Sequence, residues 1–138
     1  MNKRKILLID DDTIMLRVIE NYLANEYEVI STNSSKNVYD ILHQELPDLI
    51  LLDYEMPLFD GASILNMIRK MRETKYIPVI FLSGKIDQLA MAKVMDNNPQ
   101  GFITKPVTKE ELLRRLNSFF DDLDSQMFKN VENRHWEI

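Results

Sequence analysis

The chain has no cysteine and only three glycines among its 138 residues. Without cysteine it cannot form a disulfide framework, a thiol nucleophile or a cysteine-ligated zinc site. No apolar run exceeds four residues, whereas a membrane helix needs ~20, and the basic N-terminus is followed by too few apolar residues for a signal peptide. The formal charge of −5 argues against a direct nucleic-acid partner. We therefore expect a cytoplasmic protein with no membrane partner.

The pattern of short apolar runs predicts a parallel β-sheet. Runs of this length that are rich in Ile, Leu and Val are typical of strands buried on both faces. Together with a more alternating segment that suits an edge strand, they predict strands at 5–9, 27–32, 48–52, 77–82 and 101–104. With 45% hydrophobic residues, the chain has the size and composition of one globular domain.

Helical periodicity separates these strands. We expect Thr13 to cap the first helix and Ser35 the second, because hydroxyl side chains favour that position. A third helix is expected after Gly61 and a fourth at 88–97, and a capping box that begins at Thr108 opens a fifth. The fold class is therefore α/β, a single doubly wound (βα)5 domain with a parallel sheet.

Polar side chains follow four of the predicted strands. They are Asp10 and Asp11 after the first strand, Asp53 after the third, Ser83 after the fourth and Lys105 after the fifth. Ligands bind at the carboxyl ends of the strands in an open α/β sheet, so we expect these residues to converge. Clustered carboxylates select a hard cation such as Mg²⁺. The spacing therefore predicts a phosphoryl-transfer site, in which a carboxylate is itself a competent acceptor.

Each of these residues also has an ordinary structural explanation. An aspartate at the end of a strand is more often a turn residue or a helix cap, and Asp12 fits that explanation best. A serine after a strand and a lysine before a proline are ordinary turn residues too. What favours a site is the coincidence of complementary groups after four strands of one short chain.

Four stretches together resemble the response regulator receiver domain of two-component signalling, the CheY-like family. They are KILLIDDD at 5–12, LILLDYEMP at 49–57 followed by Asp60-Gly61, IPVIFLSG at 77–84 and GFITKP at 101–106. The resemblance extends over residues 4–120. It implies a five-stranded parallel sheet in the flavodoxin-like order 2-1-3-4-5.

The resemblance implies a role for each residue of the cluster. Asp53 corresponds to the phosphoacceptor, which carries an aspartyl phosphate in the active state. Asp10 and Asp11 correspond to the acidic pair that serves Mg²⁺, with Asp11 as a direct ligand and Asp10 acting largely through water. Asp53 and the backbone carbonyl of Glu55 would complete the protein ligands. Ser83 corresponds to the hydroxyl that binds the attached phosphoryl group.

Four further residues receive roles in the same way. Lys105 corresponds to the ammonium that pairs with the phosphoryl group, and its bond to the following proline is expected to be cis. Phe102 takes the aromatic switch position, whose ring turns inward when Ser83 moves toward the phosphoryl group; without a tyrosine hydroxyl, this switch is expected to be steric. Glu55 and Lys85 occupy positions that tune phosphoryl lifetime, and their charges either meet or stay solvated.

Two alternative functions remain open. The run from Asp10 to Thr13 also fits the nucleophile motif of haloacid-dehalogenase-type Mg²⁺-dependent phosphatases, with Asp10 as nucleophile and Asp12 as general acid. That interpretation leaves 53–57 unexplained and finds no later acidic pair for the metal. The other alternative is a receiver-like binding module that is never phosphorylated. The absence of Gly-x-Gly and Gly-Lys-Ser/Thr runs excludes a dinucleotide-binding domain and a P-loop enzyme.

The receiver resemblance implies that a histidine kinase or a histidine phosphotransfer protein donates the phosphoryl group, and that the domain catalyses only its own phosphorylation and dephosphorylation. Output to an output domain or target protein would use the face of the fourth helix, fifth strand and fifth helix, with Lys93, Asp96, Asn97, Phe102, Lys109, Arg114 and Arg115. We expect a receiver domain at 4–123 and a C-terminal helix extension or tail at 124–138, with a homodimer as one option. The chain is expected to be a stand-alone receiver or a fragment of a longer protein.

Overall fold

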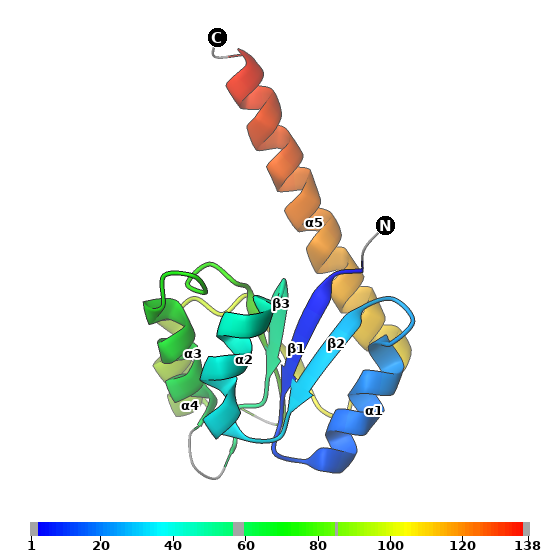
Figure 1. Ribbon diagram of the computed structural model, residues 1–138, viewed down its shortest axis with the longest axis vertical. Coiled ribbons are helices and arrows are strands. Elements are labelled where there is room, and N and C mark those ends of the chain that lie inside the picture. Colours follow the sequence, from blue (N-terminus) through cyan, green and yellow to red (C-terminus); the bar gives the residue numbers. More distant parts are fainter. Residues whose placement is uncertain (1–2, 57–59, 85, 137–138) are drawn as a thin grey trace. The chain divides into compact units, whose positions relative to one another are not determined.

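The computed structural model describes residues 3–56, 60–84 and 86–136, with side chains described as far as residue 128. The strands are β1 (Lys5–Ile9), β2 (Glu28–Thr32), β3 (Leu49–Leu52), β4 (Val79–Ser83) and β5 (Gly101–Thr104). They form one sheet in the order β2-β1-β3-β4-β5, and every neighbouring pair is parallel (Figure 1). The predicted fold class and strand order are confirmed.

Helices alternate with these strands along the chain. They are α1 (Thr13–Leu23), α2 (Val38–Glu45), α3 (Gly61–Lys70), α4 (Gln88–Met95) and α5 (Lys109–Trp136), with a 3₁₀ turn η1 (Ser35–Asn37) before α2. The predicted fourth helix ends two residues early, at Met95. Each α-helix except α5 is short, so the connections between successive strands are short as well.

Two predicted helix caps are wrong, and α2, the helix that Ser35 was expected to cap, follows Asn37, which makes no side-chain cap hydrogen bond. Asp12, and not Thr13, caps α1, because its extended backbone lets the carboxylate accept hydrogen bonds from two N–H groups of the first turn. Ser34, and not Ser35, caps the turn η1, where its hydroxyl accepts from the backbone N–H of Lys36 at 3.3 Å. In both cases the residue predicted as the cap already has helical backbone, and the residue before it has the extended backbone that a cap requires.

The strands in the middle of the sheet are buried on both faces. All four residues of β3 and all five of β4 are buried. Side chains alternate between the faces of a strand. Helices α2, α3 and α4 lie on one face of the sheet (Figure 1), and side chains from these helices and from the strands form one buried cluster. The buried members of this cluster are Leu7, Ile9, Val38, Leu42, Ile50, Leu52, Ile64, Leu65, Ile68, Val79, Phe81 and Val94. This core fixes the strand ends, and with them the residues that follow.

Helix α5 belongs to a second compact unit, residues 108–138, distinct from the unit of residues 1–107. Its 28 residues make it about 42 Å long. The hydroxyl of Thr108 accepts a hydrogen bond from the N–H of Glu111 at 3.1 Å, which confirms the predicted cap. Helix α5 runs through positions 123 and 124 without a break, and the division into 4–123 and 124–138 stays a prediction. Within the described residues, no helix combines the length and apolarity of a membrane span.

Candidate functional site

The strand order brings two aspartates together at the carboxyl edge of the sheet. Strands β1 and β3 are neighbours, with Ile9 opposite Leu52. The residues that follow them are therefore neighbours too, and the N–H of Asp53 donates to the carbonyl of Ile9 at 2.9 Å. Asp10 is held on the other side by β2, since its N–H donates to the carbonyl of Thr32 at 3.2 Å. The backbone ladder thus positions both carboxylates before any side-chain contact is made.

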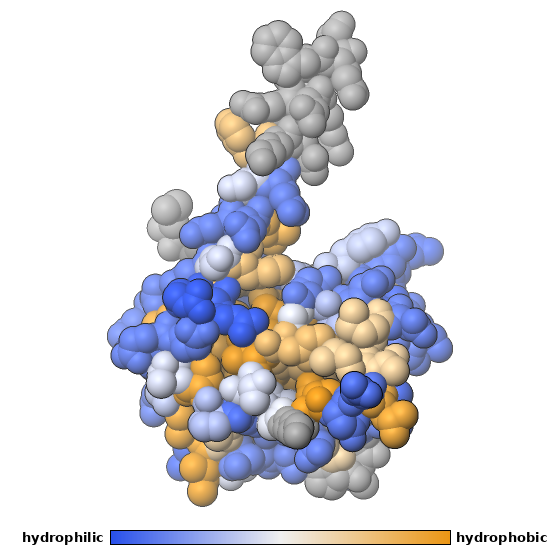
Figure 2. Space-filling model, turned by 180° about the vertical axis from the view of Figure 1, so that it is seen from behind, coloured by the Kyte–Doolittle hydropathy of each residue, from blue (hydrophilic) through white to orange (hydrophobic). Residues whose placement is uncertain are grey.

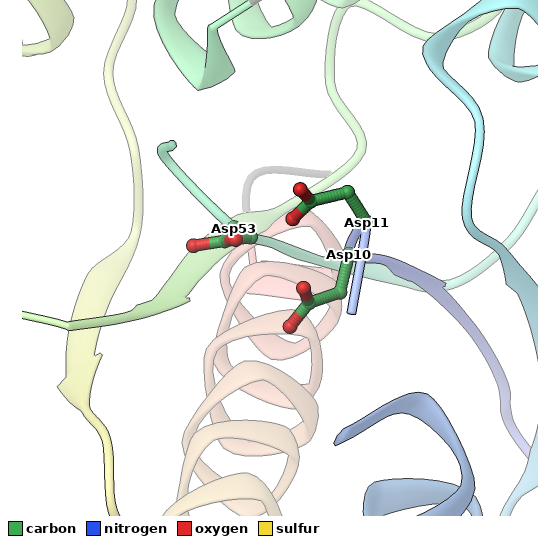
Figure 3. Close-up of side chains that lie close together, drawn as sticks. All are labelled: Asp10, Asp11 and Asp53. Carbon is green, nitrogen blue, oxygen red and sulfur yellow. The ribbon is translucent and has the colours of Figure 1, made fainter. Parts of the chain in front are cut away.

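Three carboxylates gather at this edge, as Figure 3 shows for Asp10, Asp11 and Asp53. One oxygen from each of the three lies within 4.8 Å of the others. Asp10 and Asp53 are only 3% and 8% exposed, whereas Asp11 is exposed. The cluster is therefore buried on one side and open to solvent at Asp11.

Asp10 is held by donors at both of its oxygens. Lys105 forms an ion pair with Oδ2, and the backbone N–H of Asp12 donates to Oδ1 at 3.0 Å. Strand β5 delivers Lys105 to this position, because the N–H of Lys105 donates to the carbonyl of Ser83 at 2.7 Å. The peptide bond from Lys105 to the next proline is cis, as expected. The partner of the Lys105 ammonium in this structure is therefore Asp10.

Asp53 is bound by the hydroxyl at the end of β4. Ser83, itself 3% exposed, donates from Oγ to Oδ1 of Asp53 at 2.7 Å. Burial raises the pKa of Asp53; the Ser83 hydroxyl and the charge of Lys105 oppose this rise, and the nearby Asp10 adds to it. A carboxylate crowded by another carboxylate in a desolvated position is poised to bind a cation or to react with an electrophile.

The donor set and its surroundings fit Mg²⁺. Its oxygens are all hard ligands, and Mg²⁺ binds through a few carboxylates while it keeps several waters. Beside the cluster lies a cavity of about 430 Å³ lined by Asp11, Tyr54, Glu55, Met56 and Asp60. That volume accommodates a hydrated ion and a phosphoryl group. Bound there, Mg²⁺ would neutralise the carboxylates and the phosphoryl oxygens.

Of the remaining predicted switch and lifetime residues, the structure describes Phe102 and Glu55. The ring of Phe102 is partly buried in the core cluster and stacks on Phe81, with centroids 5.5 Å apart and planes inclined by 11°. Glu55 is exposed and lines the cavity beside Asp11. Lys85 lies outside the described residues, so its predicted pairing with Glu55 stays a prediction.

Sequence reasoning missed how closely Gly61 supports the acceptor. A Cβ atom at Gly61 would lie 2.8 Å from the carbonyl oxygen of Asp53, from the Cα of Tyr54 and from a ring carbon of Phe81. The N–H of Gly61 also donates to the carbonyl of Tyr54 at 2.6 Å. Only a glycine leaves room for this approach. The sequence signal was the Asp60-Gly61 pair, in which Asp60 caps α3.

The geometry disfavours the phosphatase alternative. A nucleophile needs an oxygen that can reach phosphorus, yet both oxygens of Asp10 are engaged by Lys105 and by the Asp12 N–H. The proposed general acid, Asp12, instead caps α1 by accepting from Ile14 at 3.0 Å and from Met15 at 3.1 Å. The ordinary structural explanation of Asp12 is therefore confirmed.

Comparison with known proteins gives a consistent result. The model of the response regulator receiver domain family matches residues 6–117. Among curated proteins, the chain is 30% identical over 131 residues to the "Probable transcriptional regulator ycf27" of Porphyridium aerugineum, covering 94% of this chain and 53% of that protein. The chain spans about half or less of the length of the curated relatives it matches.

Solved structures show the same fold. A CheY-like response regulator receiver domain protein from Methanospirillum hungatei superposes with a TM-score of 0.83 at 24% identity, covering 91% of this chain and 99% of that one. The phosphorylated cyanobacterial phytochrome response regulator RcpA superposes with a TM-score of 0.72 at 30% identity, covering 85% and 91%. With the family match extending over most of its length, the chain belongs to the response regulator receiver domain family, whose members are the phosphoaccepting switches of two-component signalling.

Proposed function

We propose that Asp53 is the phosphoacceptor of this domain and takes its phosphoryl group from a phosphohistidine on a histidine kinase or a histidine phosphotransfer protein. The observation that carries the proposal is the position of the Asp53 carboxylate, 2.7 Å from Ser83 Oγ and within 4.8 Å of the Asp10 and Asp11 carboxylates. In the described part of the chain, no second group of three or more carboxylates lies close enough together to share a cation.

The transfer exchanges one bond to phosphorus for another. A carboxylate oxygen of Asp53 attacks, the bond between phosphorus and the donor's imidazole nitrogen breaks, and an acyl phosphate forms. Asp10, Asp11, Asp53 and the backbone carbonyl of Glu55 are the proposed Mg²⁺ ligands. The ion supplies charge neutralisation, which together with positioning accounts for nearly all catalysis of phosphoryl transfer.

The protein's own groups must then change partners. Lys105, which pairs with Asp10 in this structure, would turn to the new phosphoryl oxygens, and Ser83 would move its hydroxyl from the Asp53 carboxylate to the phosphoryl group. An ammonium is a compact charge on a flexible stem, so it can exchange anionic partners without a fixed geometry. Phe102, stacked on Phe81, is the proposed steric relay from Ser83 to the surface.

Chemistry in this domain is proposed to be confined to its own phosphorylation and dephosphorylation. Glu55 lies exposed at the cavity next to Asp11, and we propose that its carboxylate meets a water that approaches the attached phosphoryl group. We assign the tuning of phosphoryl lifetime to Glu55 together with Lys85.

The phosphorylated state is proposed to act on an output domain or target protein through the surface of α4, β5 and α5, with a homodimer as one outcome. Within the first compact unit, α4 exposes Leu89 (79%) and Met95 (51%) beside the exposed Lys93 and Asp96. The surface seen from behind likewise mixes hydrophobic with hydrophilic side chains (Figure 2). Such mixed surfaces are typical of reversible contacts.

Labelling with a small phosphodonor tests the acceptor. With acetyl phosphate and Mg²⁺, intact-mass spectrometry should show one added, base-labile phosphoryl group on the wild type. Asp53→Asn or a chelator should reduce labelling to background, because the nucleophile or its neutralising cation is then missing.

The matched control is Asp12→Asn, which keeps a good helix cap beside the cluster. It should label like the wild type, whereas the phosphatase alternative needs Asp12 as its acid. Labelling that persists in Asp53→Asn and maps to Asp10 would reject the proposal, and so would a wild type that takes no phosphoryl group.

A further inference from the structure

The end of α3 and the loop that follows it before β4 carry a concentration of positive charge in an acidic protein. Four of the 17 basic residues fall within positions 69–76, with one acidic residue, although the chain has a formal charge of −5. Lys70, Arg72 and Lys75 are exposed, and none of the ion pairs among the described residues involves them. We refer to residues 69–76 as the basic loop.

The basic loop lies far from the phosphorylation chemistry. Strand β4 begins at Val79, three positions after the last residue of the loop, and ends at Ser83, whose hydroxyl donates to Asp53 of the carboxylate cluster. The basic loop is therefore at the amino edge of the sheet, and the cluster is at the carboxyl edge. A partner bound to the loop leaves the approach to Asp53 open.

Internal hydrogen bonds hold the basic loop in one conformation. The buried Thr74 donates from Oγ1 to the carbonyl of Ile68 at 2.7 Å. Arg69 donates to the carbonyl of Ile77 at 2.7 Å and, through Nη1, to that of Lys75 at 3.4 Å. The loop therefore presents its charges on a fixed frame, which reduces the entropy lost on binding.

The basic loop also exposes an aromatic side chain. Tyr76 is 85% exposed, the largest exposed fraction among the exposed large hydrophobic side chains, and the Lys75 ammonium lies 5.0 Å from the centre of its ring. Exposed tyrosines flanked by cations are typical anchors of protein interfaces, since the ring has a large contact area and few rotatable bonds.

Helix α5 carries a surface of complementary chemistry. Positions 116–128 contain no lysine or arginine and include Asp121, Asp122 and Asp124. Asp121, Asp124 and Phe128 are three and four residues apart, so they share one face of the helix, and all three are exposed, Phe128 to 64%. The charge of this acidic face is opposite to that of the basic loop, and an aromatic side chain, Phe128, lies at the end of the face.

We propose that the basic loop of one copy docks on the acidic face of helix α5 of a second copy. Lys70, Arg72 and Lys75 would lie against the aspartates, with Tyr76 packing beside Phe128. The contact joins two different surfaces, so every copy carries both halves of it. Because its charges are exposed and screened by salt, the association is expected to be weak and to depend strongly on ionic strength.

Charge reversal in two separate variants tests the contact. The loop variant is Lys70→Glu with Lys75→Glu, and the helix variant is Asp121→Lys with Asp124→Lys. In sedimentation velocity at rising protein concentration, the wild type should gain apparent mass, and each variant alone should weaken the association roughly tenfold or more by placing like charges together. An equimolar mixture should regain it, because each reversed surface then meets an opposite charge.

Two controls separate this contact from general effects. Arg17→Glu with Lys36→Glu makes the same change in net charge at exposed positions away from the loop and should associate like the wild type. Tyr76→Ala should weaken association, whereas Tyr39→Ala, at another exposed tyrosine, should not. Raising NaCl to about 0.5 M, where the Debye length is roughly 4 Å, should abolish the gain in mass.

Several results would overturn the proposal. A wild type that stays monomeric at every concentration removes the contact outright. A mixture of the two variants that stays monomeric shows that the reversed surfaces do not meet between copies. Binding of a short oligonucleotide by the wild type, lost in the loop variant, would assign the loop to nucleic acid instead.

Discussion

Two partly buried cations lie at opposite edges of the sheet, and they have different kinds of partner. Lys105, at the carboxyl edge, forms an ion pair with the carboxylate of Asp10. Arg69, at the amino edge, binds no carboxylate among the described residues. Its guanidinium donates to the carbonyls of Lys75, Ile77, Asn97 and Asn98 and to the side chain of Gln100.

The difference separates the carboxyl edge, where a cation can exchange partners, from the amino edge, where a cation is held by several backbone groups. The Lys105 ammonium can leave one carboxylate for another anion, because a point charge has no fixed geometry to satisfy. The planar guanidinium of Arg69 satisfies several fixed backbone acceptors at once and ties the end of α3 to the loops before β4 and β5. Burial also lowers the pKa of Arg69. A switch needs both properties, since a partner exchange at one edge acts on the rest only through a rigid frame.

Removing the Arg69 guanidinium should destabilise the amino edge, with the largest effect of any substitution predicted for the two edges. Arg69→Met keeps the aliphatic stem but leaves several carbonyls without their donor, so we expect a loss of about 2–4 kcal/mol in the free energy of unfolding. Hydrogen exchange should rise at Asn97, Asn98 and Gln100. Labelling of Asp53 by acetyl phosphate should be unchanged at temperatures where the variant is folded.

The matched control for this loss is Arg72→Met, three residues further on and exposed. It should alter stability by less than about 0.5 kcal/mol. If Arg69→Met unfolds like the wild type, or if it abolishes labelling while fully folded, the division of roles between the two edges is wrong.

Filling the space at Gly61 should damage the carboxyl edge by a smaller amount. In Gly61→Ala the new methyl group meets backbone atoms of Asp53 and Tyr54 at 2.8 Å, and backbone cannot move aside as a side-chain end can. We expect a loss of about 1–3 kcal/mol in the free energy of unfolding and labelling of Asp53 slower by roughly tenfold, since small misplacements are costly in transfer reactions.

Gly84→Ala is the comparison for this prediction, because nothing lies within 4 Å of a Cβ at that position. It should leave stability within about 0.5 kcal/mol of the wild type. Equal losses from the two substitutions would show that helix and turn propensity, and not the contact with Asp53, decides the outcome.

The sequence predicts the carboxyl edge well because its signals are local. Each strand is a continuous apolar run, and the polar residue that follows it is adjacent in sequence, so the fold class alone places Asp10, Asp53 and Ser83 together. The two misplaced caps show where local signals stop. At 12–13 and again at 34–35, neighbouring residues both have capping side chains, and the backbone angles decide between them.

The amino edge was not predictable in the same way. The acceptors of Arg69 are mostly backbone carbonyls, which every residue has, and they lie up to 31 positions away in the chain. The pairing of Lys105 with Asp10 spans 95 positions, and from sequence its alternative partner, a phosphoryl group on Asp53, is equally consistent. The closeness of Gly61 to Asp53 likewise depends on how α3 approaches β3 and β4, which no spacing in the sequence specifies.

The smallest predicted effect concerns how much the buried, ionised carboxylate of Asp53 lowers the free energy of unfolding. Burial raises the pKa of Asp53 above its ordinary value of 3.8. Between the unfolded and folded pKa values, the folded chain holds a proton that the unfolded chain has released, so stability falls as pH rises through that window. Above the folded pKa the full cost of a buried charge beside Asp10 is present, and Asp53→Asn removes it while its amide oxygen still accepts from Ser83.

Thermal unfolding of Asp53→Asn and the wild type from pH 4 to pH 8 measures this cost. We expect the variant to melt roughly 2–4 °C higher near neutral pH, with the gap closing as pH falls and the wild-type carboxylate takes up its proton. Excess Mg²⁺ should also narrow the gap at neutral pH, because a cation offsets the repulsion in the wild type alone. Asp96→Asn, at an exposed position on the rim of α4, should show no such gap. A variant that is less stable at neutral pH, or a gap that is constant with pH, would mean that the carboxyl edge carries no stored electrostatic cost for phosphorylation to relieve.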